Sequence, residues 1–202
     1  MRITSHGHSC FLIESDGYSL VLDPYSDNTV PGLPSLRLKA DAVLCSHDHF
    51  DHNFSGAVEL SGRSCPFKIT KLPVFHDTEG GAKRGCSTIH IIEHGDLRAA
   101  HLGDLGHPLS SDQLRSLSGL DVIMIPVGGF YTVDAAAAKR TADEIGAPVV
   151  IPMHYRVGKR GFDVIGTLED YLSLCDDVVY AGRSIEIIKG MKKQTAVVDV
   201  DG

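Results

Sequence analysis

The stretch LCSHDHFDHN, residues 44–53, places three histidines and two aspartates within six consecutive positions. Its first three residues, 44–46, end the apolar run DAVLCS, residues 41–46, which predicts a buried strand. The histidines and aspartates follow that run directly. Functional side chains concentrate in loops that a rigid scaffold holds in place. The sequence therefore predicts a functional site at the end of this strand.

The spacing within this stretch indicates metal binding. His47 and His49 are two residues apart, so their rings can converge on one point in an extended or loosely turned chain. Asp51 and His52 follow after a bend and can reach a second point. Such a pair of points suits two metal ions about 3.5 to 4 Å apart. A solvated loop with unrelated histidines is the alternative, and the H-x-H-x-D-H pattern disfavours it.

Four ligands from one loop cannot complete two metal sites, so the sequence predicts further ligands at other strand ends. His76, Asp104 and His154 each follow an apolar run. Asp104 is the natural bridge, because a carboxylate can join two ions and an imidazole cannot. His101 is an alternative to His76, but its place inside a predicted strand favours a role in the core. Imidazole and carboxylate together suit Zn²⁺ first, with Mn²⁺ or Fe²⁺ as alternatives.

Short apolar segments bounded by turn residues predict a chain dominated by strands. The expected strands are residues 10–15, 18–23, 41–46, 87–94, 97–102, 121–126, 148–152, 184–189 and 195–200, with hairpin turns at 15–18 and 93–96. Helices are expected near 54–60 and over 110–118, 132–146 and 167–175. Hairpins followed by alternating strands and helices predict an α/β (α+β) fold, a four-layer αββα sandwich, with residues 1–202 as one domain.

Several motifs resemble, in order, the metal motifs of the metallo-β-lactamase fold superfamily: HDHFDH (47–52), FHD (75–77), HLGD (101–104) and PMH (152–154). The resemblance covers nearly the whole chain. It implies that one metal is bound by His47, His49 and His76, the other by Asp51, His52 and His154, and both by Asp104. The glycine that commonly follows the first motif by two positions is absent, because Asn53 and Phe54 follow His52 here, and this predicts a different entry into the next helix.

Longer stretches are similar to a hydrolase branch related to the L-ascorbate-6-phosphate lactonases. They are GHSCFLIES (7–15), VLDPYS (21–26), HDTEGGAKRG (76–85), HLGDLGH (101–107) and IPVGGFYTVDA (125–135).

Four residues outside the metal motifs are candidates to support the site. Asp23 ends an apolar run and could accept a hydrogen bond from a ligand imidazole, although it could also be a turn aspartate. His8 and His107 lie beside predicted strand ends, where a substrate contact, a proton donor and a structural role are all open. Tyr131 could offer its hydroxyl to the pocket.

Charge and composition indicate which kinds of substrate and which cellular compartment to expect. Lys83 and Arg84 lie between glycines and would suit an anionic group, with a solvated turn as the alternative. The net charge is −7 without a long basic run, so we expect a small-molecule substrate and no broad nucleic-acid or membrane binding. Five cysteines without CxxC spacing and no apolar run of about 20 residues favour a cytoplasmic protein.

Two bound ions that share a water lower its pKa from near 16 toward about 7, so no serine or cysteine nucleophile is required. Asp51 would orient that water or accept its proton, and Cys45, inside the apolar run, is expected to be a structural thiol. The expected reaction is hydrolysis of a small anionic ester, lactone or phosphate.

Other functions use the same pattern. One is a metal-dependent phosphodiesterase or nuclease, which the acidic charge disfavours. Another is a metabolite-binding protein with negligible turnover, and a diiron redox role would lack any flavin-binding segment. A homo-oligomer is compatible with a domain of this kind.

Overall fold

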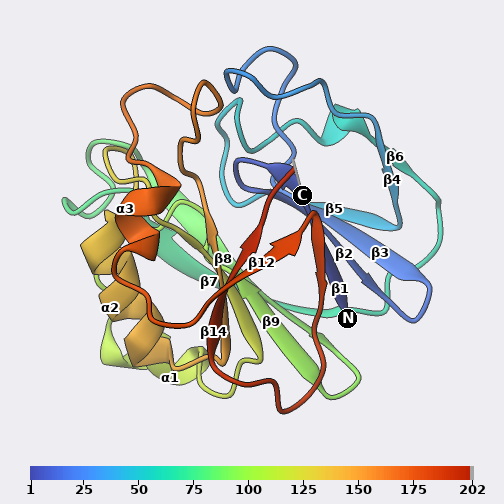
Figure 1. Cartoon of the computed structure of the whole chain (residues 1–202). Helices are drawn as coiled ribbons and strands as arrows, with labels where there is room; N and C mark the ends of the chain where they lie inside the picture. The colour runs from blue at the N-terminus through green and yellow to red at the C-terminus, as the bar shows by residue number, and fades with distance from the viewer. Residues whose placement is uncertain (201–202) are drawn as a thin grey trace.

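The computed structural model describes residues 1–200 and contains two large β-sheets packed face to face (Figure 1). The first sheet has five strands in the order β13-β1-β2-β3-β5. Their bounds are Ser184–Glu186 (β13), Arg2–Gly7 (β1), Cys10–Ser15 (β2), Tyr18–Leu22 (β3) and Ala42–Leu44 (β5). The pairing of Ser15 with Tyr18 confirms the predicted hairpin at 15–18.

The second sheet has seven strands in the order β12-β14-β11-β10-β9-β8-β7. Their bounds are Val178–Gly182 (β12), Gln194–Val198 (β14), Val149–Met153 (β11), Val122–Pro126 (β10), Leu97–His101 (β9), Cys86–His94 (β8) and Lys68–Phe75 (β7). The five neighbouring strands β12, β14, β11, β10 and β9 run parallel to one another. The predicted hairpin at 93–96 reverses the chain between β8 and β9. Strands β7 and β9 both pair antiparallel with β8, so they point the same way.

The core between the sheets draws side chains from both of them. Ile3 and Phe11 of the first sheet join Met124 and Ile151 of the second in one buried cluster. Strands β10 and β11 are buried along their whole length, as their continuous apolar runs predict. The metallo-β-lactamase-like sandwich predicted from the sequence is confirmed.

Three helices cover the outer face of the seven-stranded sheet: α1 (Ser111–Ser116), α2 (Ala135–Ile145) and α3 (Leu168–Leu172). Helix α2 buries Ala138 and Ala142 in the cluster that contains Ile123. Helix α3 begins with the predicted capping pair, in which Thr167 and Asp170 bond each other's backbone. No helix within residues 1–200 has the length and hydropathy needed to cross a membrane.

The outer face of the five-stranded sheet differs from the prediction. The expected helix near 54–60 is only a 3₁₀ turn, η1 (Ser55–Ala57), followed by strand β6 (Val58–Leu60). Strand β6 pairs with β4 (Leu38–Ala40), and Val58 is buried with Tyr25 and Leu36. These strand hydrogen bonds and this burial stabilise an extended chain at residues 58–60, so the helix does not continue beyond the 3₁₀ turn. Strand β5 is also shorter than predicted and only half-buried, because it lies at the edge of its sheet.

Candidate metal centre

The predicted ligands lie at the ends of strands that open on one edge of the sandwich. His76 directly follows β7, Asp104 lies three residues after β9 and His154 directly follows β11. Strands β7, β9 and β11 share one direction, so their carboxyl ends meet at this edge. The segment that follows β5 brings His47, His49, Asp51 and His52 to the same place, since each of them has a donor atom close to one of His76, Asp104 or His154.

One donor group consists of His47, His49 and His76, whose ring nitrogens lie within 4.8 Å of one another. Nε2 of His47 lies 2.9 Å from Nδ1 of His49, and the ring centroids of His47 and His76 are 4.7 Å apart. This is the group that the resemblance assigns to one metal.

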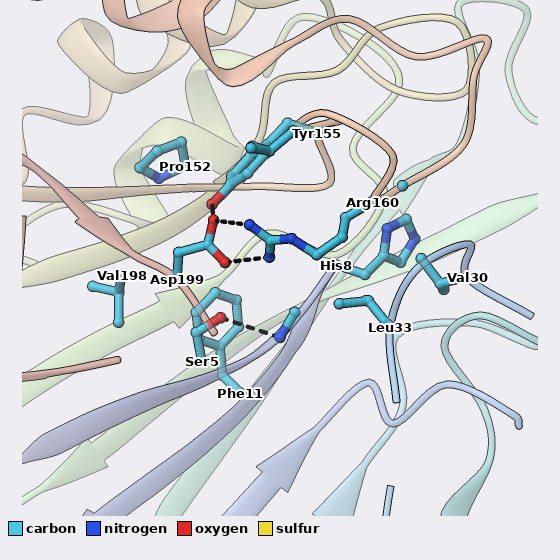
Figure 2. Close-up of a pocket in the computed structure, with 13 residues that line it drawn as sticks. Ser5, His8, Phe11, Val30, Leu33, Pro152, Tyr155, Arg160, Val198 and Asp199 are labelled. Atoms are coloured by element: carbon cyan, nitrogen blue, oxygen red, sulfur yellow. Dashed lines mark hydrogen bonds and ion pairs between the residues drawn. The ribbon is translucent and has the colours of Figure 1, made fainter. Parts of the chain in front are cut away.

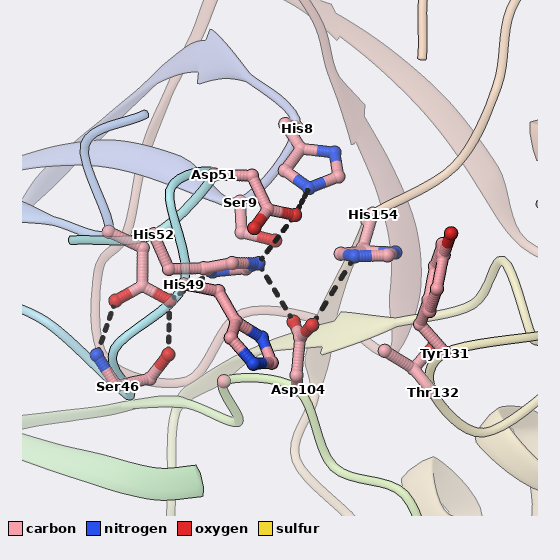
Figure 3. A network of polar contacts seen from close by, with 12 residues as sticks. His8, Ser9, Ser46, His49, Asp51, His52, Asp104, Tyr131, Thr132 and His154 are labelled. Carbon is pink, nitrogen blue, oxygen red and sulfur yellow. Dashed lines mark hydrogen bonds and ion pairs between the residues drawn. The ribbon is translucent and has the colours of Figure 1, made fainter. Parts of the chain in front are cut away.

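A second donor group consists of Asp51, His52, His154 and also His8, again within 4.8 Å of one another. Oδ2 of Asp51 lies 3.4 Å from Nε2 of His52 and 3.1 Å from Nε2 of His8 (Figure 3). The first three form the other predicted ligand set. The inclusion of His8 in the donor group was not predicted.

Asp104 lies between the two donor groups, with a fully buried carboxylate. Its Oδ1 is 3.3 Å from Nε2 of His52, and its Oδ2 is 3.4 Å from Nε2 of His154 (Figure 3). The same Oδ2 is 3.1 Å from Nε2 of His76 in the other group. Asp104 therefore occupies the position expected of a bridging carboxylate.

Hydrogen bonds behind the rings direct the ligand nitrogens toward this centre. Nδ1 of His76 donates to the carbonyl oxygen of Tyr131 at 3.0 Å, because a carbonyl can only accept. Nδ1 of His47 lies 2.9 Å from Oγ of Ser46, whose own proton goes to Asp23. When neutral, each ring therefore carries its proton on Nδ1 and presents the lone pair of Nε2 to the cluster, which is the form that binds metals.

Asp23 performs the same task for His52. Its carboxylate is fully buried and accepts from Nδ1 of His52 at 2.8 Å, and from the backbone N–H and Oγ of Ser46 at 2.7 and 2.6 Å. Asp23 thus lies behind the imidazole of His52, one of the predicted metal ligands. Its backbone φ of 45° is in the left-handed region, a strained conformation that clusters at functional sites.

The donor atoms fit transition-metal ions. Zn²⁺ binds imidazole nitrogen at about 2.0–2.1 Å in tetrahedral sites, which places neighbouring donor atoms about 3.3 Å apart. The contacts of Asp104 with His52, His76 and His154 span 3.1 to 3.4 Å. Within residues 1–200, His52 Nε2, His154 Nε2 and Asp104 Oδ1 are buried without a hydrogen-bond partner. A cation would satisfy these atoms, each of which otherwise costs about 1–3 kcal/mol.

The electrostatics of the cluster also favour a cation. Burial would raise the pKa of Asp104, but the neighbouring His154 and His52 outweigh it and hold this pKa well below its usual range. Burial likewise opposes protonation of His52, yet Asp104, Asp23 and Asp51 raise its pKa well above the usual value. Burial and His52 lower the pKa of His47 to about 3. The carboxylates therefore retain a proton on His52, and metal binding at this ring would release it.

The structure separates His76 from its rival His101. Nε2 of His101 lies 2.9 Å from the carbonyl oxygen of Ser9, and its Nδ1 accepts from the backbone N–H of Gly103. Both ring nitrogens are therefore in use, and His101 belongs to none of the donor groups within residues 1–200. The prediction that His101 is a core residue agrees with this geometry.

Of the other predicted site residues, His107 and Lys83 lie outside the donor groups. Nε2 of His107 accepts the backbone N–H of Phe75 at 3.1 Å, which fastens the end of β7. Lys83 forms an ion pair with Glu79 on the surface. Both contacts are structural, and neither brings the side chain to the donor atoms.

The loop that carries Lys83 and Arg84 is organised by Asp77, a residue that the sequence reasoning missed. The buried carboxylate of Asp77 accepts four backbone N–H groups at 2.7 to 2.9 Å, those of Glu79, Gly81, Lys83 and Arg84. These bonds outweigh the burial that would raise the pKa of Asp77 and lower it to about 2. An aspartate directly before a run of turn residues, DTEGG, is the signal that could have indicated this role.

Two hollows adjoin the centre. A groove of about 680 Å³ is lined by His49 and Asp51 together with Phe50 and Phe54, so it opens onto the donor groups. A second hollow, behind His8, has a volume of only about 20 Å³ and is closed by the ion pair between Arg160 and Asp199 (Figure 2). The second has room for about one water molecule, whereas the groove is large enough for a small molecule.

Comparison with known proteins gives consistent relationships. The family model described as a beta-lactamase superfamily domain matches residues 2–154. A relative named UPF0173 metal-dependent hydrolase, from Methanosphaerula palustris, is 30% identical over 195 residues, which cover 77% of this chain and 84% of the relative. A Thermoplasma volcanium protein of the same description is 26% identical over 82% of this chain and 86% of its own length.

Solved structures agree with these relationships. A Thermotoga maritima protein assigned to the Zn-dependent hydrolases of the metallo-β-lactamase superfamily is 31% identical, with a TM-score of 0.78 over 98% of this chain and 97% of its own. A metallo hydrolase from Ignicoccus hospitalis shares the fold at 21% identity, with a TM-score of 0.64 over 100% of this chain and 95% of its own.

Proposed function

Because this chain belongs to the metallo-β-lactamase superfamily and is a metal-dependent hydrolase, we propose that it uses two divalent ions to hydrolyse a small anionic ester, lactone or phosphate. The observation that carries the proposal is the position of Asp104 between two groups of donor atoms. Zn²⁺ is the first choice of metal, with Mn²⁺ or Fe²⁺ as alternatives, because the donors are imidazoles and carboxylates.

In this proposal, His47, His49 and His76 hold one ion, and Asp51, His52 and His154 hold the other. Asp104 lies between the two donor groups and would be a ligand to both ions. When bound, the ions would supply an activated water and a Lewis-acid contact for the carbonyl or phosphoryl oxygen of the substrate.

Asp51 acts mainly by orientation. Its side chain is 18% exposed and faces the groove, so it can reach a water on the substrate side. Burial would raise its pKa, but the neighbouring His52 and His8 hold that pKa far below the usual range. As a carboxylate, Asp51 accepts hydrogen bonds. We therefore assign Asp51 to positioning the nucleophilic water through a hydrogen bond, with His8 fixing its carboxylate.

The proposal is tested by metal analysis and a chromogenic panel on the full chain. The panel contains 4-nitrophenyl acetate, a δ-lactone and bis(4-nitrophenyl) phosphate, each assayed before chelation, after chelation and after reloading with Zn²⁺, Mn²⁺ or Fe²⁺. We expect two ions per chain and activity that is lost on chelation and restored by a metal. Hydrolysis of bis(4-nitrophenyl) phosphate alone would favour a phosphodiesterase.

A matched pair of aspartate variants isolates the centre. Asp104→Ala should lower both metal content and kcat/KM by at least about 100-fold, because it removes a donor from both groups. Asp48→Ala changes an exposed aspartate of the same loop that belongs to no donor group within residues 1–200, and should change metal content less than twofold. Activity that survives chelation, or an Asp104→Ala variant with full activity, would overturn the proposal.

We extend the proposal to the setting of the reaction. The five cysteines are free, which supports the cytoplasm, where disulfides are rare. The net charge of −7 supports a diffusible small substrate over nucleic acid or an anionic membrane. We take residues 1–202 as one hydrolase domain. The exposed side chains of Phe50 and Phe130, at 82% and 61%, support a homo-oligomer, which light scattering in solution would test.

A further inference from the structure

Two adjacent cations beside the centre have different surroundings. Lys83 is exposed and is neutralised by its ion pair with Glu79. The half-buried guanidinium of Arg84 has no carboxylate partner within residues 1–200, and its contacts there are with aromatic rings. Its charge is therefore available to a ligand, whereas Lys83 would first have to leave its ion pair with Glu79.

Contacts through Tyr131 place Arg84 at the rim of the metal centre. The Arg84 guanidinium carbon lies 5.5 Å from the centroid of the Tyr131 ring. The carbonyl of Tyr131 accepts from His76, and its ring lies 6.1 Å from that of Phe162, which in turn lies 5.5 Å from His8. Figure 3 shows Tyr131 beside His154 and Asp104. Tyr131 thus contacts one donor group through its backbone carbonyl and is linked to the other through Phe162.

The backbone that carries Arg84 is already ordered. The N–H of Arg84 donates to Asp77 at 2.8 Å, as part of the four-bond arrangement that fixes this loop. The Tyr131 and Phe130 rings hold the guanidinium at 5.5 and 5.9 Å. A preorganised guanidinium loses little entropy on binding, and its planar fork matches a carboxylate or phosphate.

The groove lined by His49 and Asp51 has the opposite character to the surroundings of Arg84. Its charged lining residues are Asp48 and Asp51, and its apolar lining is Phe50 and Phe54. An anionic group would be repelled there, whereas an uncharged or apolar group would be accommodated. Arg84 and the groove therefore suit different ends of a substrate.

We propose that Arg84 is the residue that binds the anionic group of the substrate, a carboxylate or phosphate, while the uncharged end of the substrate lies in the groove of Phe50. This inference rests on the proposed hydrolase function and names the specificity residue within it. Lys83 has no part in the recognition, although it is the neighbouring cation in the sequence.

The test compares two esters of equal chain length on the metal-loaded full chain. Mono(4-nitrophenyl) glutarate carries a terminal carboxylate, and 4-nitrophenyl valerate carries a methyl group in its place. We expect the wild type to prefer the glutarate ester. Arg84→Gln should lower the ratio of the two kcat/KM values by about 10-fold to 100-fold, mainly through KM, as loss of a hydrogen bond to a charged group implies.

Lys83→Gln is the matched control, because it removes the same charge from the adjacent residue and should change the ratio less than twofold. Arg84→Lys keeps the charge but not the fork and should restore only part of the preference. Metal content and melting temperature of each variant show whether the centre is intact. An unchanged ratio in an intact Arg84→Gln protein, or an equal loss in Lys83→Gln, would overturn the assignment.

A binding measurement separates this inference from the function on which it rests. Calorimetric titration of the metal-loaded proteins with glutarate should show at least about 10-fold weaker binding for Arg84→Gln than for Lys83→Gln. If no ester is hydrolysed but this difference appears, the hydrolase proposal fails and the role of Arg84 holds. If the esters are hydrolysed without the difference, the role of Arg84 fails and the hydrolase proposal holds.

Discussion

Replacing Asp23 with asparagine should weaken metal binding without removing any ligand. The wild-type carboxylate accepts from the backbone N–H and Oγ of Ser46 and from Nδ1 of His52. The oxygen of asparagine can keep the bond from the Ser46 N–H, so its NH₂ group must face His52. Nδ1 of His52 would then have to accept, which leaves the remaining ring proton on Nε2, the atom that faces Asp104.

The size of the effect follows from the bond that is lost. A hydrogen bond to a charged group contributes about 1.5–3 kcal/mol, which corresponds to about a 10- to 150-fold change in affinity. Burial would raise the pKa of Asp23, but His101 and His52 lower it to about 2, so the carboxylate is charged at neutral pH. The dissociation constant for Zn²⁺ should therefore rise about 10- to 100-fold at pH 7, the usual range for a residue that supports a metal ligand.

Competition between the metal-free protein and a chromophoric chelator measures this constant. Asp41→Asn is the matched control, because its buried carboxylate also accepts a backbone N–H, that of Ser19 at 2.8 Å, but belongs to no donor group within residues 1–200. Both variants should lower the free energy of unfolding, and only Asp23→Asn should alter the affinity. Wild-type affinity in Asp23→Asn, or an equal loss in Asp41→Asn, would refute the tautomer argument.

Three further predictions concern packing, pH and metal removal. Gly106→Ala should lower metal content and stability, because its Cβ would lie 2.3 Å from the backbone of His76, whereas Gly56→Ala, with its nearest contact at 3.6 Å, should retain both. Burial lowers the pKa of His90 to about 4. Below about pH 6.5 the unfolded chain therefore takes up a proton that the folded chain does not. The free energy of unfolding should thus fall between pH 6.5 and pH 4, by up to about 1.4 kcal/mol per pH unit. Urea unfolding of the metal-free protein at pH 7 and 5 should show this loss, and His90→Leu should reduce it. Chelation should lower the melting temperature measured by calorimetry, since the ions bind only the folded centre, and an unchanged value would contradict that coupling.

Local sequence carried much of the information about the centre. Residues His47 to His52 lie in one short segment, so their spacing alone indicates convergence. His76 and His154 directly follow β7 and β11, and a strand end is recognisable from the apolar run before it. The central strands β10 and β11 were predictable for the same reason, because burial on both faces makes them continuously apolar.

The remaining features of the fold and of the centre depend on pairing between strands that are distant in the sequence. Most residues of strand β7 are exposed or half-buried, and only its last four residues, 72–75, form a continuous apolar run, so its full length was not predictable, and strand β12 is likewise poorly buried. His8 enters the second donor group because the pairing of β1 with β2 shifts register between Ser5 and Gly7. Neither a bulge nor the partner of an edge strand is encoded in local spacing. The sequence could therefore propose His8 only as a residue near the site.

Backbone strain connects the fold to the proposed function. Among residues 1–200, the non-glycine residues with positive φ include His8 and His154 at 55°, Asp23 at 45° and Phe130 at 57°, all at the centre or its rim. Such conformations cost about 1–3 kcal/mol each and persist only where the surrounding structure enforces them. Here the sheets supply that enforcement: the N–H of His154 donates to the carbonyl of His8 at 3.1 Å, which ties the end of β11 to the turn after β1. The two sheets therefore hold the donor atoms in place before any ion arrives, and ion binding can then relieve the buried unpaired nitrogens instead of having to order the loops.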